Sequence, residues 1–201
     1  MAASAPPSPV GEAFRPPIHL NDLEPVCKRN RLPLDEYRGA KAYLLTLATA
    51  ERAQIFTDGE IVEHCIAELR SVAEALHFDV LAYCFMPDHL HLLTAGIEAD
   101  SYVVDFVKRF KQKTGFWFRR KFRGGLKASP AGLWQPSYHD HILRSDEALR
   151  NAALYILNNP IEAGLAGEVG DYPYAGSFVW PHLGPKSEVL ERLARTLSAG
   201  R

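Results

Sequence analysis

The stretch FDVLAYCFMPDHLHLLT, residues 78–94, contains the pattern that decides the fold. Its first part, Phe78–Met86, is an apolar run with the length and composition of a buried strand. Pro87 and Asp88 then form a turn signal. The segment His89–Thr94 follows as a second short strand. We therefore expect the stretch to fold as a central β-hairpin.

Outward from this hairpin, apolar periodicity and turn signals predict the remaining elements. They are a strand over 40–49, a helix opening at 58 or 59, a helix over 101–120, a strand over 138–144, a helix over 146–159 and a short amphipathic helix over 187–197. Ser145 is the expected N-cap of the fifth of these elements, and Pro160 is expected to end it. The order βαββαβ with one more helix predicts an α+β, ferredoxin-like (split βαβ) antiparallel sheet with helices on one face, plus a C-terminal helix.

The chain of 201 residues is expected to form one domain over 37–180. A Pro-rich tail over 1–36 precedes it, and a tail over 181–201 with the short helix follows. No apolar run is long enough to span a membrane, and the N-terminus lacks the pattern of a secretory signal. The three cysteines form no CxxC pair. We therefore expect a cytoplasmic protein with no membrane partner.

Two histidines stand one residue apart in the second strand of the hairpin. Because strand side chains alternate, His89 and His91 share one face, and Leu90 and Leu92 point to the core. Two imidazoles at this spacing can hold one metal ion, provided that a third ligand and an open position are available. The alternative is two surface histidines on a half-exposed strand, which a three-letter pattern alone does not exclude.

The helix LRNAALYILNNP, residues 149–160, offers a partner for this pair. On a helical wheel Tyr155 and Asn159 lie on one flank of the apolar stripe, and their spacing of four makes them neighbours. A phenol becomes a useful nucleophile toward a phosphodiester that a metal ion polarises. His89, His91 and an oxygen of Asn159 could hold Mg²⁺ or Mn²⁺, with Tyr155 presented beside the ion. The alternative is a surface tyrosine on a helix that ends before a proline.

Four stretches, CFMPDHLHLL, LWQPSYHDHILR, LYILNNPIEAGL and DYPYAGS, together resemble the single-tyrosine transposases of the IS200 type. Within that family the resemblance is to REP-associated tyrosine transposases, and it runs from about Arg31 to Ser177. It implies an HUH endonuclease in which His89 and His91 bind the metal, Asn159 is the third ligand and Tyr155 is the nucleophile on a catalytic helix. It also implies cleavage of single-stranded DNA beside a hairpin, with a 5′-phosphotyrosine link and a free 3′-OH. Members of the family act as a monomer or a homodimer, and the sequence favours neither.

A basic segment over 101–127 carries nine Lys and Arg residues and a single acid, Asp105, in a chain of net charge −1. Such clustering is typical of nucleic-acid binding. The expected DNA-binding cations are Lys108, Arg109, Lys111, Lys113, Arg119, Arg120, Lys121 and Arg123. Aromatic residues over 116–122 are interleaved with them and are expected to stack on unpaired bases. The alternative is a solvated helix face with the rings in the core.

Two further pairs are expected to contact DNA. Trp134 and Gln135 precede the fourth strand, where an indole could stack on a base and an amide could bond an adenine edge. His139 and His141 repeat the spacing of the first histidine pair. They are a rival metal pair, residues near the scissile phosphate, or partners of Asp140.

The sequence thus predicts a metal-dependent endonuclease and strand-transferase for single-stranded DNA with a hairpin. Two other functions stay open: a hairpin-binding protein that does not cut, and a metal phosphoesterase with a water nucleophile. The last would leave Tyr155 without a role.

Overall fold

The computed structural model describes residues 34–122 and 132–180. Its strands are β1 (Ala42–Ala48), β2 (Phe78–Met86), β3 (His89–Gly96), β4 (His139–Leu143) and β5 (Ala175–Gly176). Its α-helices are α1 (Gly59–Ala75), α2 (Val103–Lys121) and α3 (Asp146–Glu162). Three short 3-10 helices are η1 (Leu34–Tyr37), η2 (Ala50–Arg52) and η3 (Ile55–Thr57). The expected helix over 187–197 and Arg123 lie outside the described residues, as do the expected tails apart from residues 34–36.

The five strands form one antiparallel sheet in the order β4-β1-β3-β2-β5. The order of the first four strands, with α1 and α2 as the crossovers, is the ferredoxin-like arrangement, so the predicted fold class is confirmed. The strand β5 was not predicted, because two residues are too few to show a period. The hairpin strand β3 lies in the middle, between β1 and β2.

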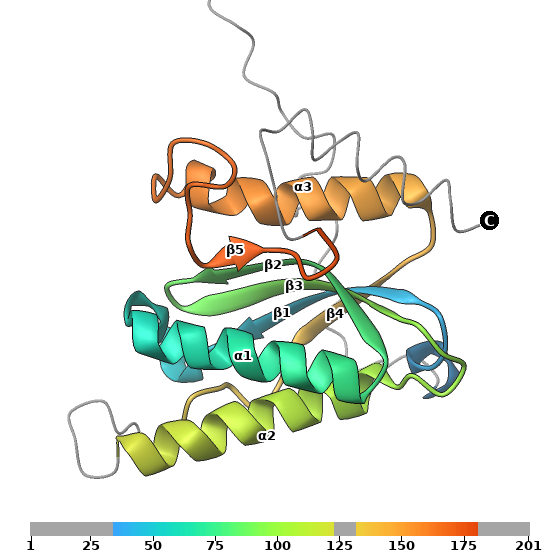
Figure 1. Ribbon diagram of the computed structural model, residues 1–201, viewed down its shortest axis with the longest axis horizontal. Coiled ribbons are helices and arrows are strands. Elements are labelled where there is room, and N and C mark those ends of the chain that lie inside the picture. Colours follow the sequence, from blue (N-terminus) through green and yellow to red (C-terminus); the bar gives the residue numbers. More distant parts are fainter. Residues whose placement is uncertain (1–33, 123–131, 181–201) are drawn as a thin grey trace, which may run out of the picture.

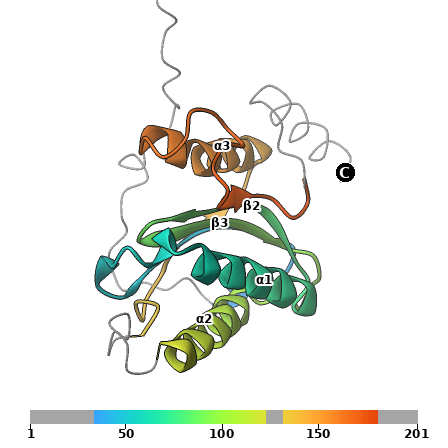
Figure 2. The same cartoon turned by 60° about the vertical axis from the view of Figure 1, so that its left-hand side comes forward.

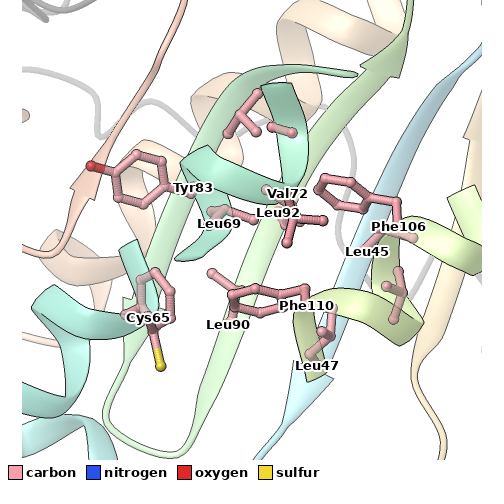
Figure 3. Close-up of a cluster of buried hydrophobic side chains, with 14 of the residues drawn as sticks. Leu45, Leu47, Cys65, Leu69, Val72, Tyr83, Leu90, Leu92, Phe106 and Phe110 are labelled. Atoms are coloured by element: carbon pink, nitrogen blue, oxygen red, sulfur yellow. The ribbon is translucent and has the colours of Figure 1, made fainter. Parts of the chain in front are cut away.

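Helices cover both faces of the sheet. Helices α1 and α2 pack side by side on one face, and α3 lies across the other (Figures 1 and 2). The sheet's side chains alternate between two apolar cores in the way that strand geometry requires. On the α1/α2 face, Leu90 and Leu92 are fully buried with Leu69, Phe106 and Phe110 (Figure 3).

The second core forms on the α3 face. It joins Leu44, Cys84 and Leu93 of the sheet to the α3 stripe that contains Ala153 and Ile156. All five side chains are buried. This packing places one flank of α3 directly over β2 and β3.

The predicted start of α3 is confirmed, and its predicted end is wrong. The hydroxyl oxygen of Ser145 accepts the backbone N–H of Ala148 at 3.1 Å, as an N-cap should. The helix then continues through Pro160 to Glu162 instead of ending at residue 159. A proline in the last turn removes one N–H donor and leaves the rest of the turn intact. Gly164, at φ 69°, closes the helix, and the N–H of residue 165 bonds the carbonyl oxygen of Pro160 at 2.8 Å.

Candidate functional site: two histidines under a tyrosine helix

The two histidines of β3 point to the face that α3 covers. Leu90, which lies between them, is fully buried in the opposite core, so the alternation expected from the sequence is confirmed. His91 is buried, and His89 is partly exposed at the edge of the site. Their Nε2 atoms are 2.9 Å apart. Two ring nitrogens bound to one cation by bonds of about 2.1 Å at a right angle would be about 3 Å apart, so the pair fits a shared metal ion.

The other ring nitrogen of each histidine has a polar partner. Asp88 Oδ1 lies 2.5 Å from His89 Nδ1, and Thr46 Oγ1 lies 3.1 Å from His91 Nδ1. A hydrogen on each Nδ1 leaves the lone pair of each Nε2 free. Carboxylates and hydroxyls commonly orient metal-binding histidines in this way. Both rings are therefore held with their free nitrogens turned toward a common point.

Burial and the neighbouring groups set the ionisation states of His91 and Asp88. Burial lowers the pKa of His91 to about 3, and the electrostatic interactions of its ring with His89 and Arg52 act in the same direction. His91 is therefore a neutral imidazole, which is the form that binds metals. Burial alone would raise the pKa of Asp88, but its bonds with His89 and Arg52 outweigh burial and lower it. Asp88 is therefore an ionised carboxylate.

Helix α3 brings Tyr155 to this pair. The centroid of the Tyr155 ring lies 5.4 Å from that of His91, and the two planes meet at 76°. The ring is half-buried on the flank of the apolar stripe, as the helical wheel predicts. Burial raises the pKa of Tyr155; a hydrogen bond from Asn159 opposes this, and Glu162 adds to it. The phenol therefore keeps its proton at neutral pH and needs activation before it can attack.

Asn159 lies one turn beyond Tyr155 on the same flank. Its Nδ2 donates to the main-chain carbonyl oxygen of Tyr155 at 2.8 Å, so Oδ1 is the side-chain atom left for a ligand. Within residues 34–122 and 132–180, no three His, Cys, Asp or Glu side chains are grouped so as to hold a metal ion. A third protein ligand from the described part of the chain would therefore be of another type, as the amide oxygen of Asn159 is.

Three residues of the site were not predicted: Thr46, Asp88 and Arg52. Asp88 stands directly before His89, but its only predicted role was in the turn. Thr46 faces His91 across the β1–β3 ladder, which no local pattern reveals. Arg52 bonds Asp88 from a 3-10 helix that was not predicted.

The basic residues of α2 lie across the sheet from this site, since α2 and α3 cover opposite faces (Figure 1). Six of the seven within the described residues are exposed: Lys108, Arg109, Lys113, Arg119, Arg120 and Lys121. Two of these six, and the partly buried Lys111, are engaged within the protein. Lys113 pairs with Glu68 at 2.6 Å, Lys121 pairs with Glu60, and Lys111 Nζ donates to the carbonyl oxygens of residues 135–137.

The expected stacking role of Trp134 does not fit the structure. The indole is buried and packs against Phe56 and Phe110, and its Nε1 donates to Thr114 Oγ1 at 2.8 Å. No face of the ring is left open to a base. The rings over 116–122 are divided: Phe118 is buried, residues 117 and 122 are partly buried, and only residue 116 is well exposed.

His139 and His141 lie on β4, at the edge of the sheet beside β1, and Gln135 lies in the loop before β4. His139 pairs with Thr46, which pairs with His91, so both histidines lie in one row and on one face. Two strand spacings of about 4.8 Å separate their backbones, so the structure does not bring His139 into the metal pair. His141 follows on the same face, and both side chains are exposed. The backbone N–H of Gln135 bonds the carbonyl oxygen of Ala48, the residue opposite His89.

Known proteins resemble this chain in sequence and in fold. The family described as Transposase IS200 like matches residues 40–159. A Haemophilus influenzae protein named as a candidate REP-associated tyrosine transposase is 29% identical over 137 residues, which are 66% of this chain and 77% of the relative. The REP-associated tyrosine transposase of Escherichia coli K12 is 24% identical over 150 residues, 71% of this chain and 82% of the relative.

Among solved structures, a REP-associated tyrosine transposase bound to a REP hairpin has the same fold. Its TM-score is 0.58 at 20% identity, and the match covers 74% of this chain and 81% of the other. In the part of the chain that the structure describes, none of the helices has the length and apolar character needed to cross a membrane.

Proposed function

The chain belongs to the IS200-like transposase family, and on that premise we propose that it is a metal-dependent endonuclease and strand-transferase. Its substrate is single-stranded DNA at or near a hairpin, and Tyr155 forms the covalent link. The hairpin substrate is supported by the solved relative, which is bound to a REP hairpin.

One observation carries the proposal: the ring of Tyr155, from α3, lies 5.4 Å from that of His91, from β3. The Nε2 atom of His91 in turn lies 2.9 Å from that of His89. The proposed nucleophile and the proposed metal-binding pair, which come from distant parts of the sequence, are thus neighbours. Because both come from the same chain, one monomer holds the complete set, and a homodimer is not needed to assemble it.

In the proposed reaction, His89, His91 and Asn159 hold Mg²⁺ or Mn²⁺. The bound ion would polarise the scissile phosphate and neutralise its charge. The phenol oxygen of Tyr155 attacks phosphorus, and the bond to the 3′ oxygen breaks. The phenol proton ends on that oxygen, which leaves a 5′-phosphotyrosine and a free 3′-OH. Rejoining reverses these steps without an external energy source.

The proposed DNA contacts fall on both sides of the sheet. His139 and His141 lie on the face of the site and are suited to the strand that is cut. Gln135, whose backbone bonds Ala48 at the end of β1, is also suited to that strand. The exposed cations of α2 are suited to phosphates of the hairpin on the other face. Lys111, Lys113 and Lys121 are less available, because each already bonds within the protein.

The test is to incubate the protein with Mn²⁺ and a labelled hairpin oligonucleotide with single-stranded flanks. A covalent adduct that survives denaturation is expected with the wild type and not with Tyr155→Phe. Tyr102→Phe is the matched control, since Tyr102 lies at the start of α2 and stacks with Arg38 away from the site. An adduct that persists in Tyr155→Phe contradicts the assignment of the nucleophile.

A second function is supported by the exposed cations of α2 on the face away from the site. It is hairpin binding without cleavage. Tight, salt-sensitive binding of the same oligonucleotide, with no adduct and no cut in any divalent metal, would select it. Cleavage retained in Tyr155→Phe without an adduct would instead indicate a water nucleophile.

A further inference from the structure

Arg52 lies at the edge of the histidine pair, and neither the proposed metal ligands nor the proposed DNA contacts include it. Its Nη1 donates to Asp88 Oδ2 at 3.2 Å, and Asp88 Oδ1 bonds the ring of His89. The guanidinium is also close enough to His91 for its charge to act on that ring. A positive charge therefore stands beside the site where the proposed reaction would place a phosphate.

Most of this guanidinium is available to a ligand. Its side chain is 53% exposed. A guanidinium carries five N–H donors, and within residues 34–122 and 132–180 its side chain has one hydrogen-bond partner, Asp88. The planar fork of arginine suits the oxygens of a phosphate.

The backbone fixes where this side chain can go. Glu51 and Arg52 both have φ near +56°, a left-handed conformation that is unfavourable for side chains other than glycine. Backbone bonds to the hairpin turn hold them there: the Thr49 N–H donates to the carbonyl oxygen of Asp88, and the Phe56 N–H donates to that of Pro87. The Thr49 hydroxyl lies within bonding distance of the carbonyl oxygens of both Asp88 and Ala53. A strained segment that is clamped to the metal-binding hairpin is typical of a functional position.

We propose that Arg52 binds a phosphate of the DNA strand next to the histidine pair, with Asp88 holding the guanidinium in place. This deepens the proposed function and rests on it for the identity of the ligand. Asp88 then serves two groups at once, the imidazole of His89 and the guanidinium of Arg52. The metal site and the phosphate site would thus share one carboxylate.

The test measures binding alone, in a Tyr155→Phe background that cannot form the covalent link. The probe is a fluorescein-labelled hairpin oligonucleotide with single-stranded flanks, in EDTA, at several salt concentrations. Arg52→Gln should weaken binding by roughly tenfold or more, as loss of a charge-assisted bond does. The slope of log affinity against log salt should fall by about 0.7, the value for one contact to a single strand. Arg52→Lys should keep the slope and lose part of the affinity.

The matched control is Arg38→Gln. Arg38 precedes β1 and Arg52 follows it, so the seven residues of the strand, at a rise of about 3.3 Å per residue, lie between them. Its guanidinium stacks on Tyr102. Affinity and slope should stay at the values of the Tyr155→Phe parent.

A second measurement locates the phosphate. Single methylphosphonates are placed at successive positions of the flank, which removes one charge at a time. At the contacted position the parent protein should lose affinity while Arg52→Gln loses none further. Equal losses for both proteins at every position would overturn the contact.

The outcomes separate this inference from the proposed function. If Arg52 only orients Asp88 and His89 for metal binding, Arg52→Gln would leave affinity and salt slope unchanged in EDTA, and the phosphate contact would be refuted. Cleavage and adduct formation by the wild type would still stand. If the wild type forms no adduct but Arg52→Gln lowers both affinity and slope, the nuclease proposal fails and the phosphate contact stands.

Discussion

The contact between Thr46 and His91 gives the sharpest test of the proposed metal site. Thr46→Val replaces the hydroxyl by a methyl group of similar size. In the structure this hydroxyl lies 3.1 Å from Nδ1 of His91, and His91 is 6% exposed. Water therefore has little access to the nitrogen that loses its partner.

The size of the effect follows from the two tautomers of His91. A metal bound to Nε2 requires the proton on Nδ1, and in Thr46→Val this buried N–H has no acceptor, which costs about 1–3 kcal/mol. Metal affinity should therefore fall by roughly 5- to 150-fold. Without metal the ring can carry its proton on Nε2 and donate it to His89 Nε2, 2.9 Å away. Stability in EDTA should then change by less than about 1 kcal/mol.

The assay has two arms. Mn²⁺ is titrated into the DNA-free protein and the free ion is followed by electron paramagnetic resonance, while urea unfolding in EDTA reports stability. Thr46→Ser keeps the hydroxyl and should bind Mn²⁺ within a few-fold of the wild type. The reasoning is refuted if Thr46→Val binds Mn²⁺ as tightly as the wild type, or if its loss of stability in EDTA matches its loss of binding energy.

Three further predictions concern stability and reactivity. Lys111→Met should destabilise the fold by about 2 kcal/mol, measured by urea unfolding, because the carbonyl oxygens of residues 135–137 lose their charged donor; an unchanged midpoint would contradict it. His77→Gly should raise the unfolding free energy by about 0.5–1 kcal/mol, because His77 has φ 57° after α1 and glycine adopts this conformation without strain. Loss of the exposed pair between His77 and Glu98 would reduce this gain. His77→Ala should not stabilise the protein. Burial raises the pKa of Cys84 from 9.0 to about 12, so its thiol should resist labelling at neutral pH in the folded protein, and its contribution to stability should decline as pH rises from about 9 toward 12, since the unfolded thiol ionises first. Labelling at the rate of a free thiol would show that the group is accessible.

The hairpin and the face of its histidines could be predicted because they depend on local pattern. Strand alternation assigned His89 and His91 to one face and Leu90 to the other, and the structure confirms both. The partners of the histidines depend instead on register. Thr46 is 45 residues away along the chain and meets His91 only through the β1–β3 ladder. A single sequence contains no local signal for that pairing.

The charge pattern of α2 was informative about the helix and misleading about several of its residues. A count of basic residues treats every lysine as free. Packing of α1 beside α2 brings Glu68 to Lys113 and Glu60 to Lys121, and the loop before β4 folds over Lys111. Opposite charges on neighbouring helices cannot be recognised before it is known that the helices pack together.

Tyr155 lies beside His91 because of two patterns, one in β3 and one in α3. The period of two in β3 sends the imidazoles to one face, and the period near 3.6 in α3 sends an apolar stripe toward that same face. Where the helix crosses the sheet its stripe includes the small residues Ala152 and Ala153, which are buried against the strands and allow a close approach. A tyrosine on the flank of the stripe then reaches the neighbouring imidazole without entering the core. The packing of the helix thus positions the proposed nucleophile, so the proposed reaction depends on the apolar stripe of α3 as much as on the phenol.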